Sequence, residues 1–502
     1  MKRFYTNVAT RGNNIYVRGY NNGKKFQEIV PYEPYLFIES EKGTYSTISG
    51  KKVGKIDFES IKEAKNFINK YNNVSNFEVY GLTNFQYVYL NDEFAGEIEF
   101  DPTVISVVDI DIEVPAEHGF PKPSTADVPV SNITISKNKK MLVFGTKYYK
   151  PKDDNVTYVL CKDEADLLKQ FLEYWNSPEW APDVVTGWNI DRFDIPYLYN
   201  RICKVLSEAF AKTLSPWKIV YEHELVRGKS MSRSSKNMED RVEKVYELLG
   251  ISSLDYLELY RKFSFKNQES YKLDYIAQVE LKENKLDYSH FKSIYQFYVM
   301  DYETFVDYNI HDVRLVDMLE DKLGLIQQVF ALAYDAKVNY IDTLATVRPW
   351  DVIIHNYLMN QRIVVDPMRR GDMDWLIGGY VKEPSIGMSE WVVSFDYDSL
   401  YPHLIMQYNI SPETYVGREA TWPGLDRLIS GEFDVSNLDP QLHYSHAANG
   451  CAYVKNKQGF LPALMEKMYT DRVKYKKLMI EAKKELEEIE KELERRENEN
   501  NK

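Results

Sequence analysis

The segment VISVVDIDIEV, residues 104–114, decides how this chain folds. From Val108 onward apolar and acidic residues alternate, which is the pattern of a β-strand with one buried face. Asp109, Asp111 and Glu113 therefore share the opposite face of the strand. Three carboxylates so placed repel one another unless a cation lies among them, and divalent cations prefer carboxylate oxygen. A solvated strand face is the alternative, because D-x-E is short and common.

The chain around this strand alternates between strand and helix patterns up to about residue 330. Apolar runs at 141–149 and 156–161 indicate strands, and amphipathic runs at 163–175 and 194–206 indicate helices. This alternation favours a mixed sheet flanked by helices. A chain of 502 residues exceeds one hydrophobic core, so we expect a multidomain protein of α/β and α+β class.

Charge and cysteine content exclude several classes of protein. The net charge of −13 argues against a protein that binds nucleic acid through a broadly basic surface, but it suits acidic clusters that hold metal ions. Cys161, Cys203 and Cys451 are far apart, which excludes a disulfide framework and a zinc ribbon. Neither a signal segment nor an apolar run of membrane-spanning length is present. We therefore expect a cytoplasmic protein without membrane contact, in the host cytoplasm if it is viral.

Two further acidic residues could join the carboxylates of this strand. TGWNIDRFD, residues 186–194, places Asp194 at the start of an apolar helix. DYNIHD, residues 307–312, places Tyr308 and Asp312 four residues apart on one helical face. Each has a simpler interpretation, because an aspartate at a helix start often caps that helix and Asp312 could be a surface charge. We interpret His311 as a surface residue and not as a metal ligand.

Three motifs occur here in the order found in 3′→5′ proofreading exonucleases: D-I-E at 111–113, N-x(3)-F-D at 189–194 and Y-x(3)-D at 308–312. The chain resembles the DnaQ-like, RNase H-like exonuclease domain of family B DNA polymerases. The resemblance implies that two Mg²⁺ or Mn²⁺ ions are held by Asp111, Glu113, Asp194 and Asp312.

The same resemblance assigns further residues to DNA. It implies that Tyr308 orients the attacking water, that Phe120 stacks on the terminal base of a single-stranded 3′ end, and that Asn189 contacts DNA. Asp109 falls outside the family pattern. The polar and basic segment 226–241 lies where relatives carry a strand-separating hairpin, so it is a candidate DNA contact.

SFDYDSLYPHLI, residues 394–405, resembles the polymerase motif D-x-x-S-L-Y-P of the same family. The resemblance implies that Asp396, at the end of an apolar strand, binds the catalytic metal pair. It also implies that Tyr401 lies under the sugar of the incoming dNTP, and that the turn at Ser399 and Leu400 positions the triphosphate. Asp398 departs from the motif, which has a small or hydroxyl residue there. A strand-end carboxylate is the alternative interpretation of Asp396.

Basic and glycine residues on either side of this motif extend the resemblance. Arg472 and Lys476 lie on one helical face, where the family presents cations to the triphosphate. A basic stripe on a solvated helix is the alternative. Gly378 and Gly379 resemble the glycine pair that approaches the template backbone.

These observations predict five segments. They are an N-terminal α+β domain at 1–103, the exonuclease domain at 104–330, a return segment of the N-terminal domain at 331–377, a partial palm at 378–460 and the first fingers helix at 461–502. Within the last segment Met479, Ala482, Leu486, Ile489 and Leu493 are spaced as in a narrow coiled-coil seam. This seam suits a partner helix, although a solvated single helix is the alternative.

The second fingers helix, the D-T-D strand and the thumb of the family have no counterpart in this sequence. We therefore expect the N-terminal subunit of a split replicative polymerase of the T-even phage type. It would bind primer–template DNA, pair with a C-terminal subunit as a heterodimer and reach a sliding clamp through that subunit. A truncated single-chain enzyme would give the same sequence. The alternatives are a stand-alone exonuclease with a non-functional polymerase remnant, and a non-enzymatic nucleic-acid-binding module.

Overall fold

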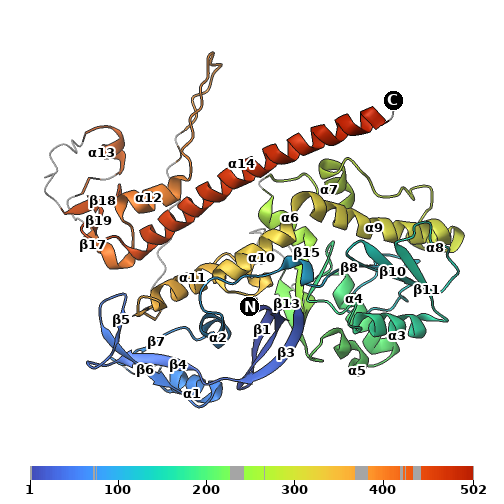
Figure 1. Cartoon of the computed structure of the whole chain (residues 1–502), viewed down its shortest axis with the longest axis horizontal. Helices are drawn as coiled ribbons and strands as arrows, with labels where there is room; N and C mark the ends of the chain where they lie inside the picture. The colour runs from blue at the N-terminus through green and yellow to red at the C-terminus, as the bar shows by residue number, and fades with distance from the viewer. Residues whose placement is uncertain are drawn as a thin grey trace. The chain divides into compact units, whose positions relative to one another are not determined.

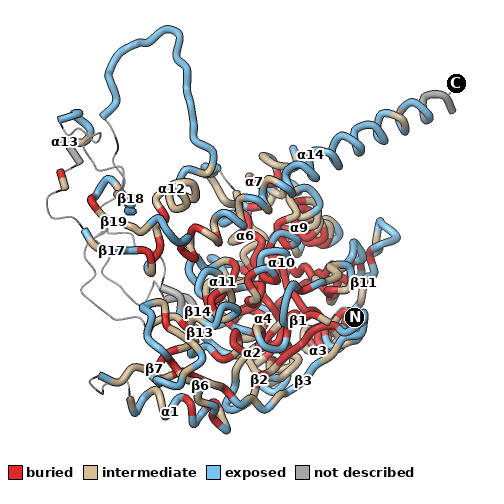
Figure 2. Tube along the Cα trace, turned by 60° about the vertical axis from the view of Figure 1, so that its left-hand side comes forward, coloured by how far each residue is buried: buried red, intermediate tan, exposed pale blue. Residues whose placement is uncertain are grey.

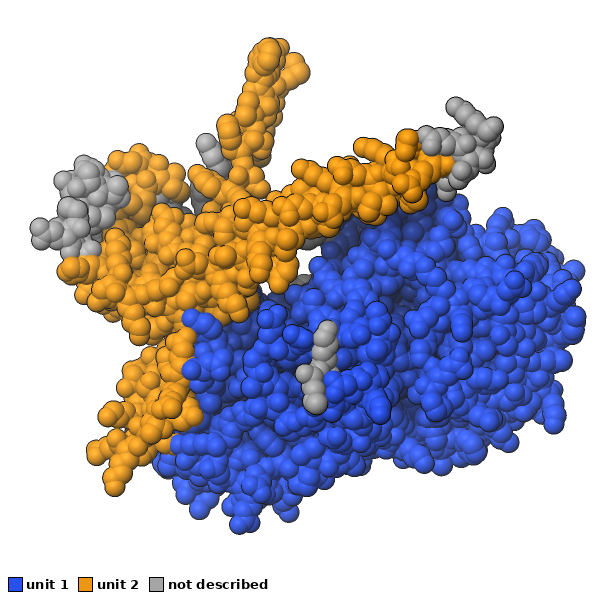
Figure 3. Space-filling view, in the orientation of Figure 1, with its two compact units in different colours: residues 1–38, 55–360 blue, residues 39–54, 361–502 orange. Residues whose placement is uncertain are grey.

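The computed structural model (Figure 1) describes residues 3–71, 74, 76–226, 242–264, 266–367, 381, 383–418, 422–423, 425–432 and 443–500. The chain forms two compact units (Figure 3), one of residues 1–38 and 55–360 and one of residues 39–54 and 361–502. Both combine helices with sheets, so the predicted multidomain α/β and α+β class is confirmed. Among the described residues, the search for a helix long and apolar enough to cross a membrane finds none.

A six-stranded mixed sheet lies at the centre of the first unit, with strand order β11-β10-β9-β8-β12-β15. Its strands are β8 (Val107–Glu113), β9 (Asn132–Lys137), β10 (Lys140–Gly145), β11 (Val156–Leu160), β12 (Val184–Gly187) and β15 (Ser252–Asp255). Strand β8 pairs antiparallel with β9 and parallel with β12, so it lies inside the sheet with neighbours on both sides. The acidic and apolar segment 107–113 therefore forms a central strand.

Helices cover both faces of β8. Val108, Ile110 and Ile112 are buried and share a core with residues of α3 (Glu164–Trp175) and α4 (Asp194–Val205). Helix α9 (Tyr302–Leu323) contacts β8 and β9. Because side chains alternate along a strand, an apolar face toward α3 and α4 leaves the acidic face toward α9. Figure 2 shows the buried residues concentrated in this unit. The remaining helices of this region are α5 (Glu208–Ala211), α6 (Tyr256–Phe263), α7 (Leu273–Glu280) and α8 (Ile294–Met300).

The N-terminal region and the segment after α9 share one hydrophobic core. This part contains β1 (Arg3–Arg11), β2 (Asn14–Asn21), β3 (Lys24–Pro31), α1 (Ile61–Tyr71), α2 (Phe85–Glu93), α10 (Leu325–Ala336) and α11 (Arg348–Met359). The Asn339 side chain bonds both backbone groups of Val8, at 2.8 Å each, and the Tyr5 hydroxyl donates to the Val338 carbonyl at 2.8 Å. The chain therefore returns to its N-terminal region after α9. The five-segment division remains a prediction.

The second unit contains a three-stranded sheet, two further short strands and a long helix. Strand β5 (Tyr45–Thr47) pairs with β16 (Ile363–Val364), and the three-stranded sheet has the order β17-β19-β18. The other elements are β17 (Tyr415–Arg418), β18 (Tyr444–His446), β19 (Cys451–Val454), α12 (Leu400–Tyr408), α13 (Leu425–Ile429) and α14 (Phe460–Asn500). Helix α14 confirms the helix predicted from about residue 461. Its seam residues Met479, Leu486 and Ile489 are 48%, 54% and 57% exposed.

The apolar strand predicted to end at Asp396 is wrong. Residues 391–395, which precede Asp396, form no strand in the structure. Trp391 is 96% exposed and Phe395 is 91% exposed. A strand needs a neighbour for its backbone amides and carbonyls, and none of the described residues pairs with this segment.

An ion pair holds the loop that follows β8. Arg201 on α4 donates to both carboxylate oxygens of Glu164, at 2.7 and 2.6 Å, and to the Ala126 carbonyl at 2.9 Å. Glu164 also accepts from the Val130 amide at 2.8 Å. The pair is mostly buried, with side chains 9% and 16% exposed. It therefore joins the loop to α3 and α4.

We expect Arg201→Met to destabilise this unit by about 2–3 kcal/mol, because it leaves the buried Glu164 carboxylate without its cation. Urea unfolding followed by the fluorescence of the buried Trp175 and Trp180 measures the loss. Lys204→Met is the control, because Lys204 pairs with Asp127 at the surface and should matter little. Equal stability of the two variants would contradict the assignment.

Candidate active site

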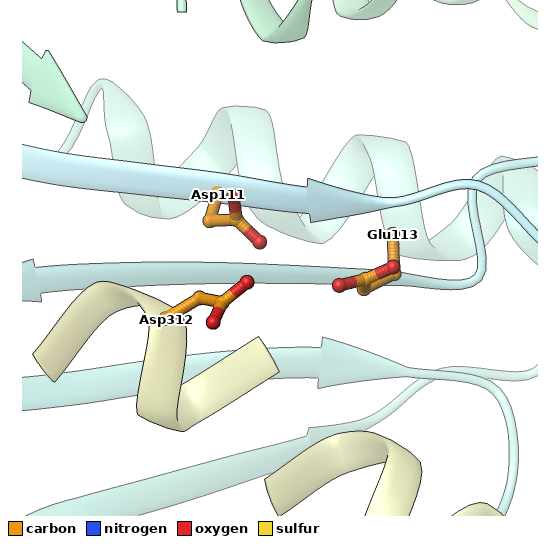
Figure 4. A group of neighbouring side chains, drawn as sticks. All are labelled: Asp111, Glu113 and Asp312. Carbon is orange, nitrogen blue, oxygen red and sulfur yellow. The ribbon is translucent and has the colours of Figure 1, made fainter. Parts of the chain in front are cut away.

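Three acidic side chains meet where β8 faces α9. Asp111 and Glu113 extend from β8 and Asp312 from α9, and they point toward one another (Figure 4). One carboxylate oxygen of each lies within 4.8 Å of the other two. Glu113 and Asp312 are buried, and Asp111 retains partial exposure. The strand period of two places the first two acids on one face, and the packing of α9 adds the third.

Asp194 lies beside this group. It is the first residue of α4, is 3% exposed, and its Oδ1 atom accepts from the Ile112 amide at 3.1 Å. It therefore contacts the backbone of β8 between the two acids of that strand. It is not one of the three residues whose oxygens lie within 4.8 Å of one another.

Burial raises the pKa of each of these carboxyl groups. It raises the pKa of Asp111 to about 7, and repulsion from Asp312 adds to the effect. It also raises the pKa of Glu113 and of Asp194 well above the usual range, and the Asp111 carboxylate adds to both shifts. Like charges held together in a buried place favour the protonated forms. A divalent cation would relieve this repulsion.

The residues fit a hard divalent cation. All three grouped ligands offer carboxylate oxygen, which is the donor that Mg²⁺ and Mn²⁺ prefer. The Oδ1 atom of Asp312 is buried and has no hydrogen-bond partner among the described residues. A buried carboxylate oxygen without a partner is costly, so its position is consistent with a ligand atom.

Lys285 is a site residue that the sequence analysis did not find. Its ammonium group forms an ion pair with Asp312 and donates to the Tyr308 hydroxyl at 3.2 Å. Burial opposes the charged form of Lys285, but the nearby Asp312 and Asp111 carboxylates outweigh it and raise its pKa. Lys285 lies in a polar stretch between two helices, so nothing in its local sequence indicates this position.

Asn309 is a second residue that the sequence analysis missed. Its side-chain amide donates to Asp111 at 2.6 Å, and its oxygen accepts from the Thr134 hydroxyl. Asn309 precedes Asp312 by three residues, so the two share a helical face. The three-residue spacing from Asp312 could therefore have identified Asn309 from the sequence.

The other residues considered in the sequence analysis of this site differ in exposure and contacts. Tyr308 is 7% exposed, and Phe120 is 78% exposed with its ring centroid 5.2 Å from that of Phe193. Asn189 adopts a left-handed conformation with φ of 67°. The His311 ring bonds the Asn284 carbonyl, and Asp109 is 3% exposed and outside the acidic group.

In the second unit, Arg472 on α14 lies against the D-x-x-S-L-Y-P motif. It donates to Asp398 Oδ1 at 3.1 Å and to the Ser399 hydroxyl. Ser399 has a φ of 52° and precedes α12, where Tyr401 is 78% exposed. The structure thus brings the predicted arginine to the predicted turn. Asp398, which departs from the family motif, is its carboxylate partner.

The other predicted polymerase residues differ in exposure and position. Asp396 and Lys476 are exposed, and Leu400 begins α12. Gly378 and Gly379 lie outside the described residues, as does most of the basic segment 226–241. Strands β13 (Val220–Val226) and β14 (Val242–Leu248) on either side of that segment pair antiparallel.

Comparison with known proteins matches two parts of this chain to protein families. The family described as "DNA polymerase family B, exonuclease domain" matches residues 53–276, and "DNA polymerase family B" matches residues 341–493. The first match contains Asp111, Glu113 and Asp194. The second contains the D-x-x-S-L-Y-P motif and Arg472.

Similar proteins include two phage polymerases. The chain is 33% identical to the DNA-directed DNA polymerase of Escherichia phage RB69, over 96% of this chain and 55% of that protein. It is 31% identical to that of Enterobacteria phage T4, over 95% of this chain and 54% of the relative. The DNA polymerase delta catalytic subunit of Dictyostelium discoideum is 26% identical over 75% of this chain and 33% of its own length. The chain spans about half the length of the two phage relatives, and it belongs to DNA polymerase family B.

Proposed function

We propose that this chain is a metal-dependent 3′→5′ exonuclease that also carries part of a DNA-directed DNA polymerase site. The observation that carries the exonuclease proposal is the group formed by Asp111, Glu113 and Asp312, with oxygens within 4.8 Å of one another. A buried group of like charges has no structural benefit of its own, and it suits cation binding. The substrate would be a single-stranded DNA 3′ end and the product a deoxynucleoside monophosphate.

Asp111, Glu113 and Asp312 would hold the metal, with Asp194 beside them. When bound, a pair of Mg²⁺ or Mn²⁺ ions supplies an activated water and stabilises the leaving 3′ oxygen. The chain itself orients the reactants. Lys285 holds the Tyr308 hydroxyl, which would direct the water.

Two residues at the edge of the site would hold the substrate strand. Phe120 is largely exposed and is braced by Phe193, so it would stack on the terminal base without selecting its identity. Asn189 would contact the DNA from the loop that leads to Asp194.

The polymerase site would be completed by another part of the family fold. Asp396 would bind metal, Tyr401 would lie under the dNTP sugar, and Arg472 and Lys476 would bind the triphosphate. We propose that a second polypeptide supplies this part as a heterodimer. The exposed seam of α14 suits such a partner, which would also provide the clamp contact.

We expect Asp312→Asn to lower the rate of 3′→5′ degradation by at least about 100-fold, because it removes a charged metal ligand. The assay follows a labelled single-stranded oligonucleotide with Mg²⁺. Asp317→Asn is the matched control, because Asp317 lies on the same helix but bonds Ser136 outside the acidic group. Full activity in Asp312→Asn would contradict the assignment of Asp312 as a metal ligand.

Metal binding should strengthen as pH rises through about 7. Burial raises the pKa of Asp111 in the metal-free protein to about 7, so this carboxyl is protonated below that pH and must lose its proton to bind metal. Because the pKa of Asp111 is higher in the folded than in the unfolded chain, the metal-free protein loses stability as pH rises from the unfolded-state pKa to the folded-state pKa. The rise in Tm on adding Mn²⁺ should therefore be larger at about pH 8 than at about pH 6. An equal rise in Tm at both pH values would refute this prediction.

The polymerase proposal predicts that this chain alone degrades a primer but does not extend it. Addition of a second polypeptide with the complementary half of the family fold should restore extension with Mg²⁺ and dNTPs. Arg472→Ala should then raise the KM for dNTP by about tenfold, because one phosphate contact is lost. Lys484→Ala, two turns beyond Lys476 on α14, is the control. Extension by this chain alone would contradict the need for a partner, and no extension in the mixture would favour a stand-alone exonuclease.

A further inference from the structure

Asp255 stands out among the buried carboxylates that the proposed reaction does not use. It is the last residue of β15 and is 1% exposed. Its Oδ1 atom accepts from the backbone amide of Asn189 at 2.9 Å and from that of Leu257 at 3.0 Å. Its Oδ2 atom accepts from the Asp191 amide at 3.3 Å. One carboxylate thus accepts hydrogen bonds from three backbone amides in two segments of the chain.

Two of these amides belong to the loop between β12 and α4. This loop starts at Gly187, whose φ of 148° and close approach to the Ile110 carbonyl exclude a side chain. Asn189 follows in a left-handed conformation, which asparagine adopts more readily than other residues with a side chain. The bonds to Asp255 fix the amides of Asn189 and Asp191 in this loop.

The loop leads directly to the metal site. The Asn189 carbonyl accepts from the amides of Arg192 and Phe193, each at 3.2 Å, and α4 then begins at Asp194. The loop conformation therefore decides where Asp194 meets the Ile112 amide of β8. Strand β15 holds the loop at a further point, because the Asp191 carboxylate accepts from the Ser253 hydroxyl.

From these contacts we infer that Asp255 is a positioning residue for the exonuclease site, which it serves by fixing the loop that presents Asn189 to DNA and Asp194 to the metal. The inference rests on the proposed exonuclease function. The competing role is that of an ordinary helix cap, because the bond to Leu257 caps α6.

Asp255→Ser separates the two roles. A serine hydroxyl caps a helix nearly as well as aspartate, but it is shorter and has one oxygen, so it cannot also serve the Asn189 and Asp191 amides. Asp255→Asn keeps one acceptor oxygen and places a donor where the second oxygen was. We therefore expect its effects to lie between those of wild type and Asp255→Ser.

The experiment measures the loop and the metal directly on the full chain. Hydrogen exchange in peptides that cover residues 186–195 should be faster in Asp255→Ser, and the Kd for Mn²⁺, measured by calorimetry, should rise about tenfold. The value of kcat for a single-stranded oligonucleotide should fall about 10- to 100-fold. Asp163→Ser is the control, because Asp163 caps α3 through the Asp166 amide at 2.9 Å and does not touch the loop.

Wild-type exchange and Mn²⁺ affinity in Asp255→Ser would overturn the inference, as would equal losses in Asp163→Ser. If the wild-type chain binds Mn²⁺ but does not degrade DNA, the proposed function fails. In that case exchange and Mn²⁺ affinity still decide the role of Asp255.

Discussion

The repulsion among Asp111, Glu113 and Asp312 is the constraint on which the first unit depends. Carboxylates held this close in a buried place oppose folding, so other interactions must hold them there. Strand β8 supplies much of this stabilisation through its apolar side chains, which are buried against α3 and α4. The alternation that buries Ile110 and Ile112 is also what places the acids together.

Neighbouring groups stabilise the buried acids without neutralising all of them. Asn309 donates to Asp111, the Ile112 amide donates to Asp194, and Lys285 pairs with Asp312. Each contact satisfies part of one carboxylate. Hydrogen bonds and one ammonium group lower the cost of burial, but a cation among the oxygens would lower it further. Because the acids are only partly neutralised, they remain able to bind a metal ion reversibly. Acids fully neutralised by permanent salt bridges would not.

Much of this site was predictable because its motifs are local. The D-I-E spacing places two acids on one strand face, and Y-x(3)-D places Tyr308 and Asp312 on one helix face. The basic residues of α14 were predictable for the same reason, and Arg472 does reach the turn at Ser399. The predicted strand at 391–395 was wrong because an apolar run specifies a strand only when a neighbouring strand is present.

Local sequence was enough to predict the family, from its motifs, and the fold class and charged face of each element, from periods of two and 3.6 residues. Which faces meet depends on how the elements pack. Asn309 and Asp111 are 198 residues apart in the chain, and Lys285 and Asp255 have no local pattern that marks them as part of the site. Their positions follow from the packing of the whole core, which depends on contacts that no short segment contains.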